Sequence, residues 1–258
     1  MPLAKPYYRI IRQFTNGNYF LYPSGEYFMH PSYADHPENY IRAFELIQKD
    51  LLALFESIEP ADQNLASYSF RIHELLMRTC MELEANFKAI LKANTCSKSA
   101  SKLNITDYFK INTSHYLAEY EVRLPYWTGT RSIWKPFDEW AANAGSGTPW
   151  SLSWYKAYNA AKHDRAGALS QANLENLLYA VTGLEALLSA QFLDHDFGPI
   201  EYMISRRRPY LGFEPGIGGY FSVKFPQNMP AAERYEFVWP ALVDQTPDPF
   251  DKFDYDSV

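Results

Sequence analysis

The chain has 258 residues, of which 47% are hydrophobic and 21% are charged. This composition is typical of a globular protein and excludes a disordered chain, a coiled coil and a small disulfide-stabilised scaffold. Because 24 Lys and Arg residues stand against 30 Asp and Glu residues, the formal net charge is −6, and any nucleic-acid-binding surface has to be a local patch.

The two cysteines, Cys80 and Cys96, have no metal-ligand spacing and do not form a disulfide framework. Residues 1–14 lack the continuous apolar stretch of a signal peptide, and no run approaches the roughly 20 apolar residues of a membrane span. We therefore expect a cytoplasmic protein with no membrane partner, no metal ion and no cofactor.

Residues 1–36 are rich in turn formers between short aromatic stretches, which predicts an irregular, extended or hairpin-like arm. Pro37 then stands where a first helical turn tolerates proline, and apolar residues recur at helical spacing as far as Ile58. The pattern predicts a helix over residues 37–58 that is stopped by Pro60.

The next periodic segment is the longest and predicts a core helix from Asp62 or Asn64 to Ala93. Residues 103–116 are expected to hold a short helix. Residues 122–127 and 131–134 are typical of a small hairpin, within an insertion that spans about residues 119–148.

Pro149 restarts a helical pattern over residues 150–165, for which Thr148 is the expected cap and Gly167 the interruption. Ser170 is the expected cap of the last strong helix, whose apolar stripe runs from Leu174 to Phe192 and stops by Gly198-Pro199. Together these patterns predict a mainly α protein with a helical core over residues 37–198 and small β additions at both ends and between the helices.

Residues 199–258 form the expected C-terminal region of short aromatic strands, at 220–225 and 235–239, followed by an acidic tail over 248–258. The tail is expected to be mobile. The glycine-rich run at 216–219 is expected to be a turn, since no helix follows it as a phosphate-binding loop requires.

The predicted helix over residues 150–165 contains the strongest candidates for functional side chains. At about 100° per residue Lys156, Asn159 and His163 share one sector, with Tyr155 and Lys162 on its flanks. The structural alternative is a hydrogen-bond ladder of Tyr155, Asn159 and His163 between helices, while Lys162 and Arg165 lie in solvent.

The segment 158–163, placed before a long apolar helix, resembles the signature of the HEPN superfamily: an Arg, a polar residue that is often Asn, three or four variable residues and a His. Asn159 and His163 match in type and spacing, whereas Tyr158 stands in place of the Arg. The upstream segment 78–84 is similar to the family's earlier helix, which brings polar residues towards the site. The resemblance covers roughly residues 37–198 without the insertion.

This resemblance implies a HEPN-like antiparallel helical bundle that acts as a homodimer and cleaves RNA without a metal ion, as a toxin or defence effector. The 2′-hydroxyl attacks the neighbouring phosphate and leaves a cyclic phosphate. His163 would be the general acid or base and Asn159 would orient it. The expected substrate-binding residues are Lys162, Arg165, Tyr158, Lys156 and Arg78.

A second interpretation is a non-catalytic HEPN-like module that binds a ligand or a partner protein, because Tyr158 cannot supply the positive charge of the family Arg. The basic run Arg206-Arg207-Arg208, next to Tyr210, is open to two interpretations as well. It contacts RNA phosphates beside a stacking ring, or it is either a solvated surface or a partner of the acidic tail.

Overall fold

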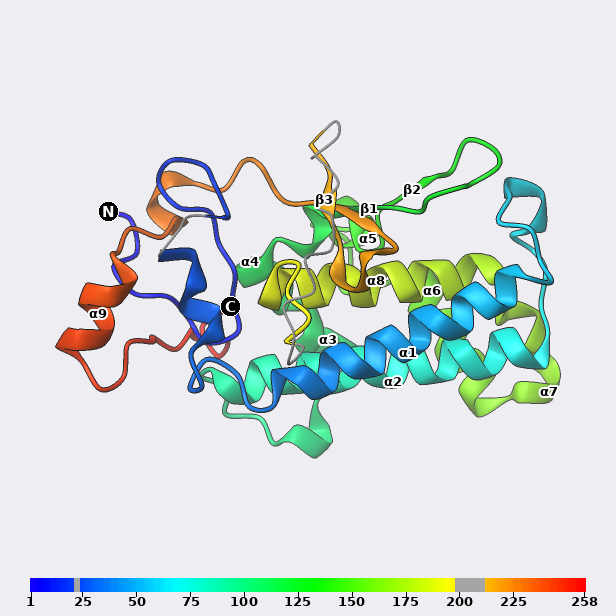
Figure 1. The fold of residues 1–258 in the computed structure, drawn as a ribbon. Helices are drawn as coiled ribbons and strands as arrows, with labels where there is room; N and C mark the ends of the chain where they lie inside the picture. Colours follow the sequence, from blue (N-terminus) through cyan, green and yellow to red (C-terminus); the bar gives the residue numbers. More distant parts are fainter. Residues whose placement is uncertain (21–23, 198–211) are drawn as a thin grey trace.

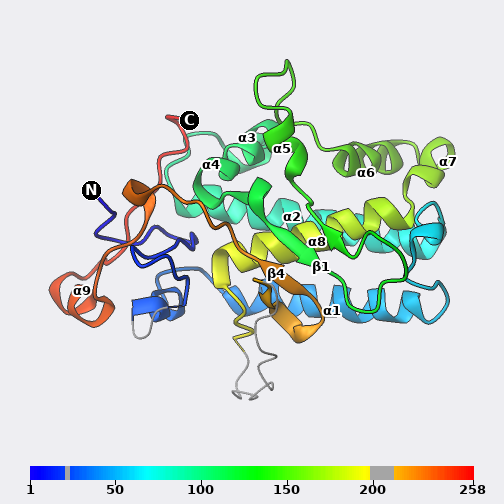
Figure 2. The same ribbon diagram turned by 90° about the horizontal axis from the view of Figure 1, so that it is seen from above.

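The computed structural model describes residues 1–20, 24–197 and 212–258 and is mainly helical, as predicted. Its long helices are α1 (Pro37–Phe55), α2 (Phe70–Ala93), α6 (Ser153–His163) and α8 (Leu174–Phe192). They lie side by side, and α8 packs against each of the other three (Figure 1 and Figure 2).

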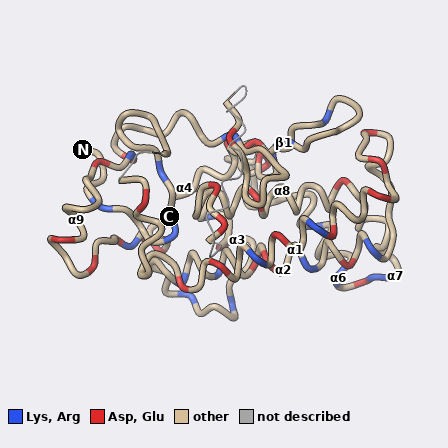
Figure 3. Tube along the Cα trace, viewed as in Figure 1, with Lys and Arg blue, Asp and Glu red and all other residues tan. Residues whose placement is uncertain are grey.

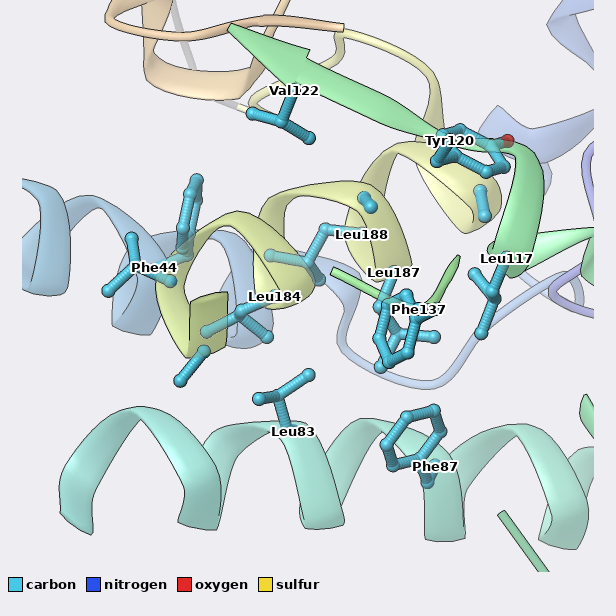
Figure 4. Packing of buried hydrophobic residues seen from close by; sticks show 14 of the residues in the cluster. Phe44, Leu83, Phe87, Leu117, Tyr120, Val122, Phe137, Leu184, Leu187 and Leu188 are labelled. Atoms are coloured by element: carbon cyan, nitrogen blue, oxygen red, sulfur yellow. The ribbon is translucent and has the colours of Figure 1, made fainter. Parts of the chain in front are cut away.

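Helix α8 is buried on nearly every side, which its sequence explains, because its apolar residues surround the helix axis instead of forming one stripe. Figure 4 shows Leu184 and Leu187 of α8 facing Leu83 and Phe87 of α2, with Val122 of the small sheet above. Each such buried side chain contributes about 1.5–3 kcal/mol, so α8 is the main source of the bundle's stability.

The shorter helical elements connect and cover these four helices. They are η1 (Ser24–Met29), η2 (Asp62–Asn64), η3 (Ala100–Lys102), α3 (Ile105–Phe109), α4 (Ile111–His115), η4 (Leu117–Glu119), α5 (Asp138–Ala142), α7 (Arg165–Ala168), η5 (Leu169–Gln171), η6 (Ile217–Gly219), η7 (Ala231–Glu233) and α9 (Trp239–Gln245). The short helix predicted within residues 103–116 is thus present as two turns, α3 and α4. No helix of the described segments has the length and apolar character needed to cross a bilayer.

A small antiparallel sheet covers α8. Its strands are β1 (Glu121–Arg123), β2 (Ile133–Trp134), β3 (Glu214–Pro215) and β4 (Ser222–Lys224), in the spatial order β2-β1-β4-β3. The predicted hairpin of β1 and β2 is confirmed with shorter strands, and β4 lies within the aromatic segment 220–225 that was predicted to be extended.

Asp62, far away in the sequence, fixes the loop of the β1–β2 hairpin. Its carboxylate accepts hydrogen bonds from Trp127 Nε1 at 2.6 Å and from the Thr130 amide at 2.7 Å. Gly129 has a φ of +128°, and a Cβ there would collide with the Asp62 carboxylate, so the loop requires glycine at this position.

Several helix boundaries differ from the predictions because other caps are used. The helix predicted from Asp62 or Asn64 begins only at Phe70, since Ser69 is extended and accepts a hydrogen bond from the Ile72 amide. Helix α1 ends at Phe55, before the predicted Ile58.

The predicted caps at Thr148 and Ser170 are wrong. Helix α6 begins at Ser153, whose amide donates to the Glu139 carboxylate at 2.9 Å. Asn173 caps α8 by accepting from the Asn176 amide at 3.0 Å.

The interruption after α6 lies at Asp164, whose φ of −135° and ψ of 77° end the helix. The same residue then caps α7 through the Gly167 amide at 2.9 Å, so Gly167 lies inside α7 instead of breaking the chain. Helix α8 ends at Phe192, where Leu193 has a φ of +57°. The predicted stop at Gly198-Pro199 lies outside the described residues.

The two ends of the chain pack together into a lobe beside the bundle (Figure 1). Leu3 and Phe14 form isolated bridges with Tyr235, and Tyr7 forms one with Asp251. The described N-terminal residues are irregular apart from η1, while residues 235–239 form a bridge and the start of α9 instead of a strand.

The acidic tail is not a free end. Tyr255 is fully buried and its hydroxyl lies 2.6 Å from Ser114 Oγ, which in turn lies 2.7 Å from Nδ1 of His115. His115 Nε2 donates to the Arg9 carbonyl oxygen at 2.9 Å, and burial lowers the pKa of His115 to about 3. The aromatic content of the tail explains why it packs although it is acidic.

A buried carboxyl group attaches the glycine-rich turn to the bundle. Glu185 in α8 accepts a hydrogen bond from the Ile217 amide at 2.9 Å, and Gln48 in α1 donates to the Ile217 carbonyl oxygen at 2.7 Å. A Cβ at Gly216 would collide with the Glu185 carboxyl group. The run 216–219 is a turn, as predicted, and burial raises the pKa of Glu185 to about 8.

The Glu185→Gln substitution should flatten the pH dependence of stability. In the unfolded chain this carboxyl group ionises near its ordinary pKa of 4.5, whereas in the folded protein it ionises only near 8. The free energy of unfolding of the wild type therefore falls as pH rises between these values. Between pH 5 and pH 8 we expect the free energy of unfolding of the variant to rise by on the order of 3 kcal/mol relative to that of the wild type. Urea unfolding at each pH measures this difference.

Glu74→Gln, at an exposed position of α2, is the matched control and should leave the pH dependence unchanged. Parallel pH profiles for the wild type and the Glu185→Gln variant would contradict this assignment.

Candidate functional site

Helix α6 has one buried and one solvent-facing side, and the predicted sector lies on the solvent-facing side. Lys156, Lys162 and His163 are exposed and Asn159 is half-buried. The opposite side packs into the core through Trp154, Tyr155, Ala157, Tyr158 and Ala161. The helix thus presents a continuous polar face to solvent.

His163 is the last residue of α6, and its imidazole is accessible. No residue of the described segments forms a hydrogen bond with its side chain or with that of Asn159, which lies one turn earlier. Tyr155 donates instead to Glu84 of α2 at 2.9 Å. The alternative of a ladder through Tyr155, Asn159 and His163 is therefore not what these residues form.

Tyr158 anchors the helix. It is buried, its ring lies 5.4 Å from that of Tyr155, and its hydroxyl accepts a hydrogen bond from Lys162 Nζ at 3.1 Å. Burial and the nearby Glu84 carboxylate raise the pKa of the Tyr158 hydroxyl far above its ordinary value. The Tyr158 phenol is thus neutral and accepts a hydrogen bond from the Lys162 ammonium group.

The other predicted cations lie in different surroundings. Lys156 is exposed on α6. The Arg165 guanidinium lies 5.7 Å from the ring centroid of Phe70, at the start of α2. Arg78 forms an ion pair with Asp50 of α1, so this side chain is directed to the neighbouring helix and is not gathered with the α6 residues.

Glu84 is a site residue that the sequence did not single out. Besides accepting from Tyr155, its carboxylate lies 3.6 Å from Lys88 Nζ. Only the register between α2 and α6 brings Glu84 to Tyr155, and the helical period of each segment contains no information about that register.

Three cavities are lined by described residues. One of about 760 Å³ is lined by α1 and α2 residues such as Leu54, Arg71 and Arg78. A second of about 410 Å³ lies beside Tyr19 and Phe225, and a third of about 340 Å³ lies between the N-terminal arm and α1.

The basic run at residues 206–208 and Tyr210 lie outside the described residues. Among the residues that the structure does describe, no three or more His, Cys, Asp or Glu side chains are grouped so that they could hold a metal ion.

The chain was compared with protein-family models, with curated proteins and with solved structures, and none of the three comparisons found a match.

Removing the two phenolic hydroxyls should have unequal effects on stability. Tyr155→Phe removes the 2.9 Å hydrogen bond to the half-buried Glu84 carboxylate and leaves it the longer ion pair with Lys88 at 3.6 Å, and a hydrogen bond to a charged group is worth about 1.5–3 kcal/mol. Tyr158→Phe removes an acceptor from Lys162, whose ammonium is exposed and can bind water instead, so we expect a loss of about 0.5–1 kcal/mol. Urea unfolding of both variants measures the difference. Equal losses would show that Glu84 does not depend on Tyr155.

Proposed function

We propose that the solvent-facing side of α6 is the active surface of a HEPN-like ribonuclease, with His163 as the general acid or base and Asn159 as the residue that orients it. The reaction is the attack of an RNA 2′-hydroxyl on the neighbouring phosphate. It breaks the bond to the 5′-oxygen and leaves a 2′,3′-cyclic phosphate and a 5′-hydroxyl end.

The observation that carries this proposal is the accessible imidazole of His163, one turn after Asn159, on a face with basic residues. Lys156, Lys162 and Arg165 form no ion pair with any described residue, so their charges remain open to a phosphate. This local excess of positive charge in a chain of net charge −6 is what an RNA-cleaving surface requires.

The residue types suit the two proton transfers. The base takes the proton of the 2′-hydroxyl, the phosphate passes through a pentavalent state, and the leaving 5′-oxygen takes a proton from an acid. Lys162 and Arg165 would stabilise the additional negative charge on the phosphate. A homodimer, which the resemblance implies, would supply a second copy of the same face for the second proton transfer.

The alternative is a non-catalytic HEPN-like module that binds a partner protein or a ligand through this face. It is favoured by Tyr158, because a buried phenol replaces the planar guanidinium that the resemblance assigns to this position. The two functions differ in one outcome, namely whether the pure protein cuts RNA.

The His163→Ala substitution should abolish cleavage without unfolding the protein. Because His163 is exposed and has no hydrogen-bonded partner in the described chain, the circular dichroism spectrum and the oligomeric state should not change. We expect the cleavage rate to fall at least about 100-fold, measured on mixed single-stranded and structured RNA in EDTA with analysis of the 3′ ends.

His36→Ala is the matched control, since His36 is also exposed but lies at the start of α1. It should cleave like the wild type and leave cyclic phosphate ends. No cleavage by the pure wild-type protein would overturn the ribonuclease and leave the interaction module.

A further inference from the structure

Two large aromatic side chains lie exposed at the start of α2. Tyr68 is 55% exposed and Phe70 is 58% exposed, although most aromatic residues of this chain are packed in its core. Exposed rings of this size contribute little to folding, so they are candidates for a contact with another molecule.

The helix cap sets the direction of these two side chains. Ser69, between them, has a φ of −162° and a ψ of 168°, and its hydroxyl oxygen accepts from the Ile72 amide. In an extended chain residues two apart point to the same side. The capping requirement of α2 therefore places both rings on one side of the chain.

The rings adjoin the end of the polar face of α6. The Arg165 guanidinium lies over the Phe70 ring, and Tyr68 forms a bridge with Asn173, which follows α7. His163 is only two residues before Arg165. Figure 1 shows the end of α6, α7 and the start of α2 at the same end of the bundle.

The surrounding charge favours an anionic partner. From Ser153 to Ala168 the chain carries Lys156, Lys162 and Arg165 against a single carboxylate, Asp164, which is engaged as the cap of α7. Figure 3 shows both basic and acidic positions at the end of the bundle where α6 and α7 lie. A polyanion with flat apolar groups satisfies both the positive charge and the exposed rings.

We propose that Tyr68 and Phe70 form a base-stacking subsite that binds an unpaired base of single-stranded RNA, while Arg165 contacts the adjacent phosphate. This inference rests on the proposed function, because it places the strand that His163 would cleave. Bases in a duplex are already stacked on one another and cannot reach the rings, so the subsite selects single-stranded over double-stranded RNA.

The test measures binding separately from cleavage. A fluorescently labelled single-stranded RNA of mixed sequence is titrated into the His163→Ala protein, with and without Phe70→Ala, and the dissociation constant is read from anisotropy. Loss of one stacked base should weaken binding about tenfold or more, whereas Phe70→Trp should retain it. A labelled RNA duplex should show no effect of either substitution.

The salt dependence of RNA binding distinguishes the contribution of the Phe70 ring from that of the Arg165 guanidinium. Arg165→Ala should reduce the slope of log K against log salt by about 0.7, the value expected for one phosphate of a single strand. Phe70→Ala should weaken binding at an unchanged slope. Met81→Ala, which removes an exposed apolar side chain elsewhere on α2, is the matched control and should bind like the parent.

The outcomes separate the subsite from the proposed function. If His163-dependent cleavage is found but Phe70→Ala and Tyr68→Ala bind RNA like the parent protein, the subsite is wrong and the ribonuclease stands. If the wild type binds single-stranded RNA through Phe70 but does not cut it, the subsite stands and the ribonuclease is wrong. If the protein binds no RNA, both are wrong.

Discussion

The burial of α8 on all sides is the constraint on which the rest of the structure depends. Its leucines contact α1, α2, α6 and the small sheet, so each of these elements is placed by packing against the same helix. A helix of this kind tolerates polar side chains only where they are hydrogen-bonded, and Gln191 accordingly pairs with Arg9 and Asn86. Glu185 uses the same burial to hold the turn at Ile217.

This packing also decides which side of α6 faces solvent. Because Trp154, Tyr158 and Ala161 turn towards the core, helical geometry directs Asn159 and His163 outwards. The hydrogen bond of Tyr155 to Glu84 then sets α6 alongside α2. The polar face and the exposed aromatic pair come together because two helices with separate apolar stripes share one core.

Periodicity was sufficient to predict the long helices and the shared sector of Lys156, Asn159 and His163, since both depend on local spacing. It left open whether that sector faces a neighbouring helix or solvent. The caps were not predictable in the same way. Glu139 caps α6 from a separate helix. Helix α8 is capped by Asn173 and not by the nearby Ser170, because the path of the chain brings Asn173 to the start of the helix. The contact of Tyr7 with Asp251 joins residues at opposite ends of the sequence, so the packed tail follows from tertiary structure and not from its acidic composition.

Binding and cleavage of RNA at the end of α6 can be examined by NMR of the histidine side chains during titration with a single-stranded RNA whose 2′-hydroxyls are methylated, so that it binds but cannot react. The His163 signals should shift along a saturable curve while those of exposed His36 remain in place. Binding that leaves the His163 signals unchanged, or no binding at all, would contradict this expectation.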